Sequence, residues 1–124
     1  MGKVLFEDDW CKITPDHLSI KCYYFPIGKR KKIDSTMIRG VYYVVQDLSD
    51  QWYKVKGWGM AITPCWWACD TLRCCHGSSN TYYNVVIDCG EATYKGFTVM
   101  NIGEFLRQLK LVAPHALYLN ELPF

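Results

Sequence analysis

Several features that usually reveal what a protein does are missing from this sequence. Its 124 residues contain no apolar run of about eighteen residues or more, so no transmembrane helix is expected. The acidic residues Glu7, Asp8 and Asp9 come too early for the apolar segment of a signal peptide. The formal net charge is only +2 at pH 7, so no strong overall field attracts nucleic acid.

Motifs for catalysis are also missing. We find neither a glycine-rich loop that cradles phosphate nor a dinucleotide-binding fingerprint. A cysteine nucleophile with His17 or His76 as its base is conceivable, but no local signature supports it and no third, orienting group can be chosen. Basic and aromatic residues interleave only over residues 52–58, which argues against a nucleic-acid-binding stripe. We therefore expect no enzyme activity, no catalytic residue, no cofactor and no nucleic-acid partner.

Apolar residues and cysteines, in contrast, are abundant. Hydrophobic residues make up 50% of the chain, which is enough to form the core of a single domain over residues 1–124. There are seven cysteines, an odd number, and no export signal is visible. A cytoplasmic protein with reduced thiols is therefore expected.

Short β-prone segments separated by turn residues fill most of the chain. Alternation is clearest over residues 18–25, where Leu18, Ile20, Cys22 and Tyr24 are expected to face the core. A turn at residues 14–16 joins this strand to the preceding one in a hairpin. The predicted strands are 4–13 (bent at its acidic residues), 18–25, 30–34, 38–46, 52–56 continuing through 60–62, 84–88 and 95–100.

One helix is predicted after the last of these strands. Asn101 suits the N-cap position, Glu104 follows three residues later as in a capping box, and Pro114 ends the helix. Its apolar stripe is expected to be core, and it consists of Ile102, Phe105, Leu106, Leu109 and Val112.

The predicted fold class is therefore mainly β, with about seven strands and one C-terminal α-helix. Short connections favour an antiparallel meander. It would form a strongly bent sheet or two packed sheets, with the helix covering one open end and its edge strands. The tail over residues 114–124 is apolar enough to pack back on this body.

Two segments resemble the pleckstrin-homology-like (PH-like) superfold, most closely the bacterial-PH and GRAM kinds. One is KKIDSTMIRGV at residues 31–41, and the other is GFTV at 96–99 followed by EFLRQL at 104–109. The resemblance spans residues 4–113 and implies a bent antiparallel sheet or barrel capped by the helix. It also implies a non-enzymatic module that binds phosphoinositides, membrane surfaces, peptides or proteins. The loop that carries basic residues in phosphoinositide-binding members is here 14–17, without Lys or Arg.

The one dense positive run is a candidate ligand- or lipid-binding site. Its residues are Lys29, Arg30, Lys31 and Lys32. Such a run can meet anionic headgroups, at about 1 kcal/mol per cation near the surface. The alternative, which we favour from sequence alone, is a solvated strand edge on which Lys discourages edge-to-edge pairing.

The segment over residues 65–76 is rich in cysteine and tryptophan. Its candidate metal ligands are Cys65, Cys69, Cys74, Cys75 and His76. The paired C-x2-C spacing of zinc knuckles is absent, so we predict no metal and favour structural thiols. Trp66 and Trp67 would suit a partner hot spot or membrane interface if exposed, or would plug the end of a small barrel if buried. Trp58, between two glycines, is expected to be buried.

The function expected from sequence is that of a non-enzymatic binding module. The first hypothesis is protein–protein interaction or scaffolding through the surface near the helix and the Trp/Cys segment. The second is peripheral binding to anionic phospholipid or phosphoinositide membranes through the basic run. The third is a metal- or thiol-dependent activity at residues 65–76.

Overall fold

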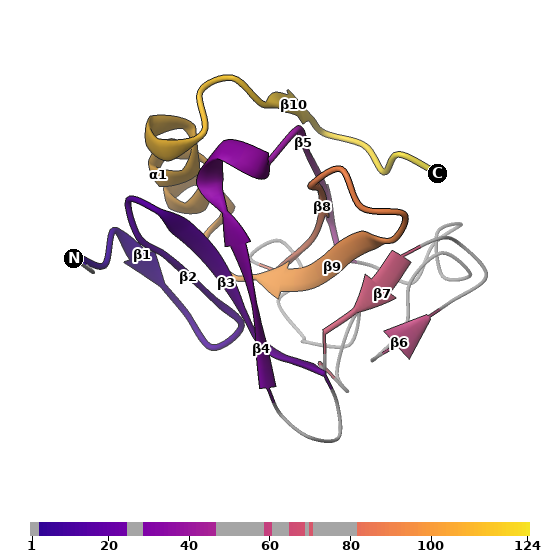
Figure 1. The fold of residues 1–124 in the computed structure, drawn as a ribbon. Helices are drawn as coiled ribbons and strands as arrows, with labels where there is room; N and C mark the ends of the chain where they lie inside the picture. The colour runs from indigo at the N-terminus through magenta and orange to yellow at the C-terminus, as the bar shows by residue number, and fades with distance from the viewer. Residues whose placement is uncertain (1–2, 25–28, 47–58, 61–64, 69, 71–81) are drawn as a thin grey trace.

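The computed structural model describes residues 3–24, 29–46, 59–60, 65–68, 70 and 82–124 (Figure 1). Within them the protein is mainly β, with two sheets and a single α-helix near the C-terminus. The elements are β1 (Phe6–Glu7), β2 (Cys11–Ile13), β3 (His17–Tyr24), β4 (Lys29–Asp34), the 3-10 turn η1 (Ser35–Met37), β5 (Gly40–Val45), β6 (Gly59–Met60), β7 (Cys65–Trp67), β8 (Tyr83–Asp88), β9 (Tyr94–Val99), α1 (Ile102–Val112) and β10 (Leu117–Leu119). The predicted strand at 52–56 and Trp58 lie outside the described residues.

The first sheet consists of β1, β2, β3 and β4 in sequence order, and every neighbouring pair is antiparallel. The prediction of one bent strand over residues 4–13 is wrong, because this segment forms two paired strands. The carboxylate of Asp8 makes the turn between them: its Oδ1 accepts hydrogen bonds from the amides of Trp10 (2.8 Å) and Cys11 (2.9 Å). The predicted turn at residues 14–16 is confirmed.

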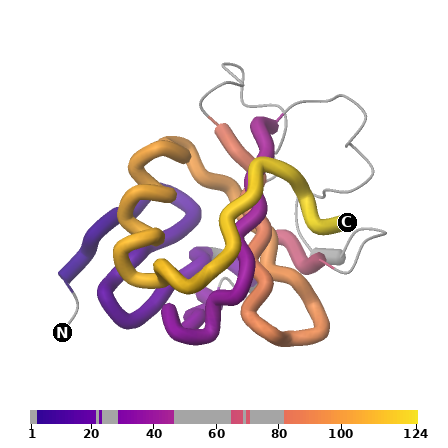
Figure 2. The backbone as a smooth tube through the Cα atoms, turned by 90° about the horizontal axis from the view of Figure 1, so that it is seen from above, coloured from indigo at the N-terminus to yellow at the C-terminus, as the bar shows by residue number. Residues whose placement is uncertain are grey.

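The second sheet has the order β10-β5-β8-β9-β7-β6. Its centre, β5, β8 and β9, is antiparallel, but β10 pairs with β5 and β7 pairs with β9 in parallel. The prediction of a simple antiparallel meander is therefore wrong for this sheet. Parallel pairing needs a long crossover, and the one that leads from β5 to β10 includes α1. In Figure 2 the C-terminal segment runs back across β5.

The predicted helix is confirmed at both ends. The Asn101 side chain accepts a hydrogen bond from the amide of Glu104 (3.3 Å), and the helix ends at Val112, before Pro114. The Glu104 side chain does not complete a capping box, because it accepts instead from the side chain of Gln108 (2.8 Å) and pairs with Arg107.

The main core lies between the two sheets and α1. It contains Ile13, Leu18, Ile20 and Ile33 from the first sheet, Val41, Val85, Ile87 and Phe97 from the second, and Phe105 and Leu109 from the helix. The remaining stripe residues Ile102, Leu106 and Val112 pack against it, so the prediction that this stripe is core is confirmed. The Phe105 ring lies 5.7 Å from Phe6 and 5.9 Å from Phe97. Each buried Phe contributes about 1.5–3 kcal/mol.

The prediction for β3 is confirmed for Leu18 and Ile20, which face the core, while the side chains of Cys22 and Tyr24 lie outside the described part of the structure. The pairing of β3 with β4 shifts register between Ile20 and Tyr24, and Tyr23 is buried rather than on the mixed face. A register irregularity of this kind changes which side chains face the core.

The C-terminal tail packs on the body, as predicted. β10 pairs with β5, and the Tyr118 hydroxyl donates a hydrogen bond to the carbonyl of Ala113 (2.8 Å). Beyond β10, Leu122 joins a second apolar cluster with Cys65, Trp67 and Val86.

Candidate functional site

The predicted basic run is divided by the alternation of β4. Successive strand residues face opposite sides of a sheet. Ile33 faces the core, so Lys31 lies on that side, and its ammonium pairs with Glu91 at 3.4 Å. Arg30 and Lys32 lie on the opposite, outer face, and Lys29 is exposed at the start of the strand. The structure therefore separates the run and leaves Arg30 and Lys32 together.

The outer face of the first sheet adds a third cation. Lys12 on β2 is paired with Ser19 on β3, and Ser19 is paired with Lys32 on β4. Directly paired residues share one face of an antiparallel sheet, so these three side chains form a row across the strands. Lys12 and Ser19 were not predicted from the sequence as site residues. The short turn at 14–16 could have indicated them, because it fixes the register of the hairpin and so pairs Lys12 with Ser19.

This row lies in an open depression of about 520 Å³. The depression is lined by Lys12, Thr14, Asp16, His17, Ser19, Arg30 and Lys32. Its lining carries three cations against the single carboxylate of Asp16. Within the described part of the chain, no ion pair joins any of the three cations to a carboxylate. A net positive charge therefore faces solvent here.

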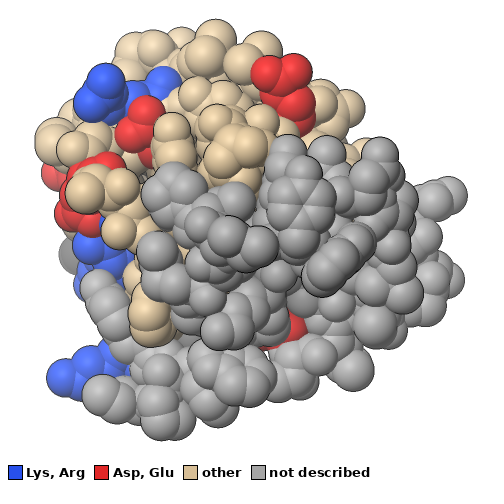
Figure 3. All heavy atoms as spheres, turned by 90° about the vertical axis from the view of Figure 1, so that its right-hand side faces the viewer, with Lys and Arg blue, Asp and Glu red and all other residues tan. Residues whose placement is uncertain are grey.

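The positive field of this face is visible in the pKa of Glu7. The hydrogen bond and charge of Lys21 lower that pKa most, and the charges of Lys12, which is paired with Glu7 across the strands, and of Arg30 lower it further. On the side of the molecule that carries β6 and β7, positive and negative side chains both lie along the margin of the described surface (Figure 3). The lining of the depression on the first sheet differs in its excess of one sign.

Ser19 forms the middle of the row and is only 3% exposed. Its hydroxyl makes no hydrogen bond with the described residues and is not one of their fully buried polar atoms, so it reaches the solvent in the depression. Because Ser19 lines the depression, this hydroxyl is available to a ligand that enters it.

The end of the depression nearest the turn is polar and internally bonded. The Thr14 hydroxyl accepts a hydrogen bond from the amide of His17 (3.2 Å), and His17 is paired with Asp34 across β3 and β4. Hydrogen bonds from Thr36 lower the pKa of the Asp34 carboxyl, with a smaller contribution from His17. These contacts hold the turn and leave the cations at the other end of the depression.

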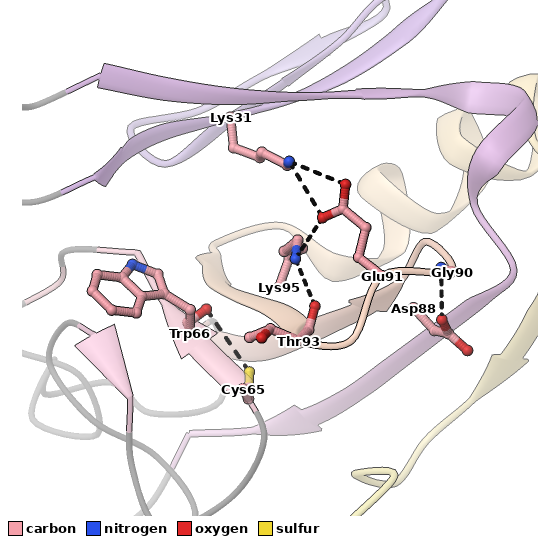
Figure 4. A network of polar contacts seen from close by, with 8 residues as sticks. All are labelled: Lys31, Cys65, Trp66, Asp88, Gly90, Glu91, Thr93 and Lys95. Carbon is pink, nitrogen blue, oxygen red and sulfur yellow. Dashed lines mark hydrogen bonds and ion pairs between the residues drawn. The ribbon is translucent and has the colours of Figure 1, made fainter.

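Lys31 belongs to a separate network, shown in Figure 4. Glu91, in the turn between β8 and β9, pairs with Lys95 at 2.7 Å and with Lys31, and Lys95 also donates to the carbonyl of Thr93 (2.6 Å). The hydrogen bond from Lys95 is the main cause that lowers the pKa of Glu91. The network joins the edge of the first sheet to the second sheet, and it neutralises Lys31.

The two tryptophans form strand β7 rather than a loop. Trp67 is completely buried, so it is a core residue and not an exposed partner contact. Trp66 is half-buried, and its indole nitrogen donates a hydrogen bond to the carbonyl of Tyr23 (2.9 Å). The structure therefore provides no exposed Trp pair at these positions.

The cysteines that the structure describes are structural. Cys65 is buried in β7, while Cys69, Cys74, Cys75 and His76 lie outside the described residues. In the described ranges, no group of three or more His, Cys, Asp or Glu residues could hold a metal ion. Burial raises the pKa of the Cys11 and Cys89 thiols, which disfavours the reactive thiolate.

Comparison with known proteins found no matching family model, no matching curated protein and no matching solved structure. Among the described residues, no helix is both long and apolar enough to cross a membrane. What the site can bind therefore follows from its own charge and geometry.

Proposed function

We propose that this protein is a non-enzymatic binding module that associates peripherally with anionic phospholipid surfaces. The contact is the outer face of the first sheet, through Lys12, Arg30 and Lys32. One observation carries the proposal: three cations without a carboxylate partner in the described residues surround a solvent-facing depression. A PH-like fold and a cytoplasmic location belong to the same proposal, and the buried, free thiols of Cys11 and Cys89 support the location.

The structure changes the ranking of the hypotheses made from sequence. The protein-partner hypothesis placed its contact on the surface near the helix and on the Trp/Cys segment. In that segment Trp67 is buried and Trp66 is hydrogen-bonded to Tyr23. In the membrane hypothesis, Lys31 no longer contributes because it is paired with Glu91, and Lys12 takes part instead because it lines the depression.

The expected affinity is weak. Each cation near an anionic surface contributes about 1 kcal/mol, so three give about 3 kcal/mol. Solvent-exposed charges are screened within about 8 Å at physiological ionic strength. Binding should therefore fade as salt is added.

Co-sedimentation with vesicles tests the proposal. We expect the protein to bind vesicles of phosphatidylcholine mixed with phosphatidylglycerol at low salt and to leave vesicles of phosphatidylcholine alone in solution. The double variant Arg30→Gln/Lys32→Gln should bind the anionic vesicles roughly 30-fold more weakly, because it removes two contributions of about 1 kcal/mol each.

A matched control keeps the change in net charge the same. Arg39→Gln/Lys110→Gln also removes one Arg and one Lys, both exposed and outside the depression. It should retain most of the binding. Equal binding to neutral and anionic vesicles, or equal losses in the two double variants, would reject the proposal.

A further inference from the structure

We infer that the row of Lys12, Ser19 and Lys32 is a binding site for one phosphomonoester group. The inference rests on the proposed function and narrows it, from any anionic surface to a headgroup with a terminal phosphate. Its basis is Ser19, a residue that is only 3% exposed, whose hydroxyl makes no hydrogen bond with the described residues and which lies between two cations in the lining of the depression.

The spacing of the row suits a single phosphate. Adjacent strands lie about 4.8 Å apart, so the backbones of Lys12 and Lys32 are separated by about 10 Å with Ser19 midway. Lys carries its charge on a long, flexible stem. The two ammonium groups can therefore converge over Ser19 from opposite sides.

The donors of the row match the acceptors of a phosphomonoester. The Ser19 hydroxyl donates one hydrogen bond, and each Lys ammonium donates at least one more. A phosphomonoester offers three terminal oxygens and a charge of about −1.5 to −2 at neutral pH. A phosphodiester offers two terminal oxygens and a single charge, so it balances only one of the two ammonium groups of the row.

Other members of the depression favour the same position for the phosphate. Arg30 lies two residues before Lys32 on β4, away from the turn, and adds a further cation. The carboxylate of Asp16 belongs to the turn, at the opposite end of the depression. An anion is therefore attracted to the row and away from the turn.

Protection of a sheet edge does not explain the row. Lys on an edge strand discourages pairing with other chains, and β4 is the last strand of the first sheet. Lys12, however, lies on β2, which is paired on both sides by β1 and β3. Lys12 is paired across the strands with Glu7 of β1, but Glu7 makes its ion pair with Lys21. A cation in the interior of the sheet without an ion pair of its own among the described residues, next to the Ser19 hydroxyl, is consistent with a ligand.

The first arm of the test uses a soluble probe. Inorganic phosphate is titrated into the full chain at neutral pH and constant ionic strength, and the backbone amides are followed by NMR with chloride as the reference. We expect saturable shifts at Lys12, Ser19 and Lys32. Ser19→Ala should weaken phosphate binding roughly tenfold, because one hydrogen bond to a charged group is lost. Ser19→Thr keeps the hydroxyl in a residue suited to a strand and should retain binding.

The second arm separates a lipid headgroup from free phosphate. Vesicles containing phosphatidic acid, a monoester, are compared with vesicles containing phosphatidylglycerol, a diester, at equal measured surface charge. The unaltered protein should prefer phosphatidic acid by roughly tenfold. Ser19→Ala should lose this preference while still binding phosphatidylglycerol, with an unchanged urea midpoint as evidence of folding.

The outcomes distinguish the phosphomonoester site from membrane binding by charge alone. If the unaltered protein binds both vesicles equally, or if Ser19→Ala keeps the preference, the inference of a phosphomonoester site is wrong and charge-driven membrane binding remains. Saturation by inorganic phosphate without vesicle binding would overturn the membrane proposal and support the phosphomonoester site, with a soluble phosphate ester as its ligand. If neither phosphate nor vesicles bind, both are overturned.

Discussion

Gly96 on β9 is paired directly with Trp67 on β7, and a methyl group added there has no space. A Cβ atom at position 96 would lie 2.4 Å from Cε3 and 2.6 Å from Cδ2 of the Trp67 ring. The ring is rigid and completely buried, so it cannot move aside as the end of a flexible side chain would. We therefore predict that Gly96→Ala destabilises the protein.

The magnitude follows from two opposing terms. Overpacking a close-packed core typically costs about 1–3 kcal/mol, and this contact is on a rigid ring, which favours the upper part of that range. Replacing Gly by Ala also lowers the conformational entropy of the unfolded chain, which stabilises by about 0.4–1 kcal/mol. The expected net loss in the free energy of unfolding is about 2 kcal/mol, or a fall in Tm of roughly 8 °C for a domain of this size.

Gly103 offers the matched control. It lies in α1, and a Cβ atom there would meet nothing within 4 Å. Gly103→Ala should therefore stabilise the protein by up to about 1 kcal/mol through helix propensity. The same substitution is thus expected to act in opposite directions at the two positions.

Urea unfolding followed by circular dichroism measures both effects through the transition midpoint. A second check places Gly96→Ala in a Trp67→Phe background, where the smaller ring leaves room. The methyl group should then cost at least about 1 kcal/mol less than in the unaltered protein, as expected for residues in contact. Gly96→Ala as stable as the unaltered protein would refute the close packing of Trp67 on Gly96.

Three further predictions concern single carboxyl or hydroxyl groups. Asp8→Ala should lower the free energy of unfolding by about 2 kcal/mol in urea, because its carboxylate accepts from the amides of Trp10, Cys11 and Met100, and Asp8→Asn, which keeps one oxygen, should lose less. The pKa of Glu91 is lowered in the folded protein. The stabilisation that the Glu91 carboxylate gives is therefore present above the ordinary pKa of about 4.3 and is lost as pH falls through the folded pKa. Glu91→Gln should flatten the dependence of the urea midpoint on pH in this acidic range, and an unchanged slope would contradict this. Burial raises the pKa of Tyr118 to about 12, so its contribution is complete below its ordinary value of about 10 and is lost as pH rises toward the folded value. Absorbance titration should show a late-ionising tyrosine whose signal is missing in Tyr118→Phe.

The elements specified by local signals could be predicted from sequence. The helix was found because Asn101 and Pro114 mark its ends and its apolar residues follow one stripe. The division of β1 from β2 could not be predicted because it depends on hydrogen bonds that the Asp8 carboxylate accepts from the amides of Trp10 and Cys11. In the sequence, the acidic residues are equally consistent with a bend in one strand. The parallel pairs β5–β10 and β7–β9 join distant segments, and no local pattern encodes such pairing.

For the same reason, the candidate site could be predicted only in part from the sequence. Arg30 and Lys32 were found as part of a charged run, although strand alternation alone would have separated them from Lys31. Lys12 and Ser19 enter the site through register across the first sheet. The burial of Trp67 depends on its pairing with Gly96, which the sequence around it does not reveal.

The order of strands in the second sheet has a consequence for a chain that is still being synthesised. The strands of the first sheet follow one another in sequence, so each can pair as soon as the next is complete. β5 differs, because both of its partners, β8 and β10, come later in the chain. A nascent chain that has completed the first sheet therefore carries β5 with two open edges, including Val41 and Tyr42. Open apolar edges of this kind promote association between chains. Until β8 and then β10 have been made and have paired, β5 is thus exposed to intermolecular pairing.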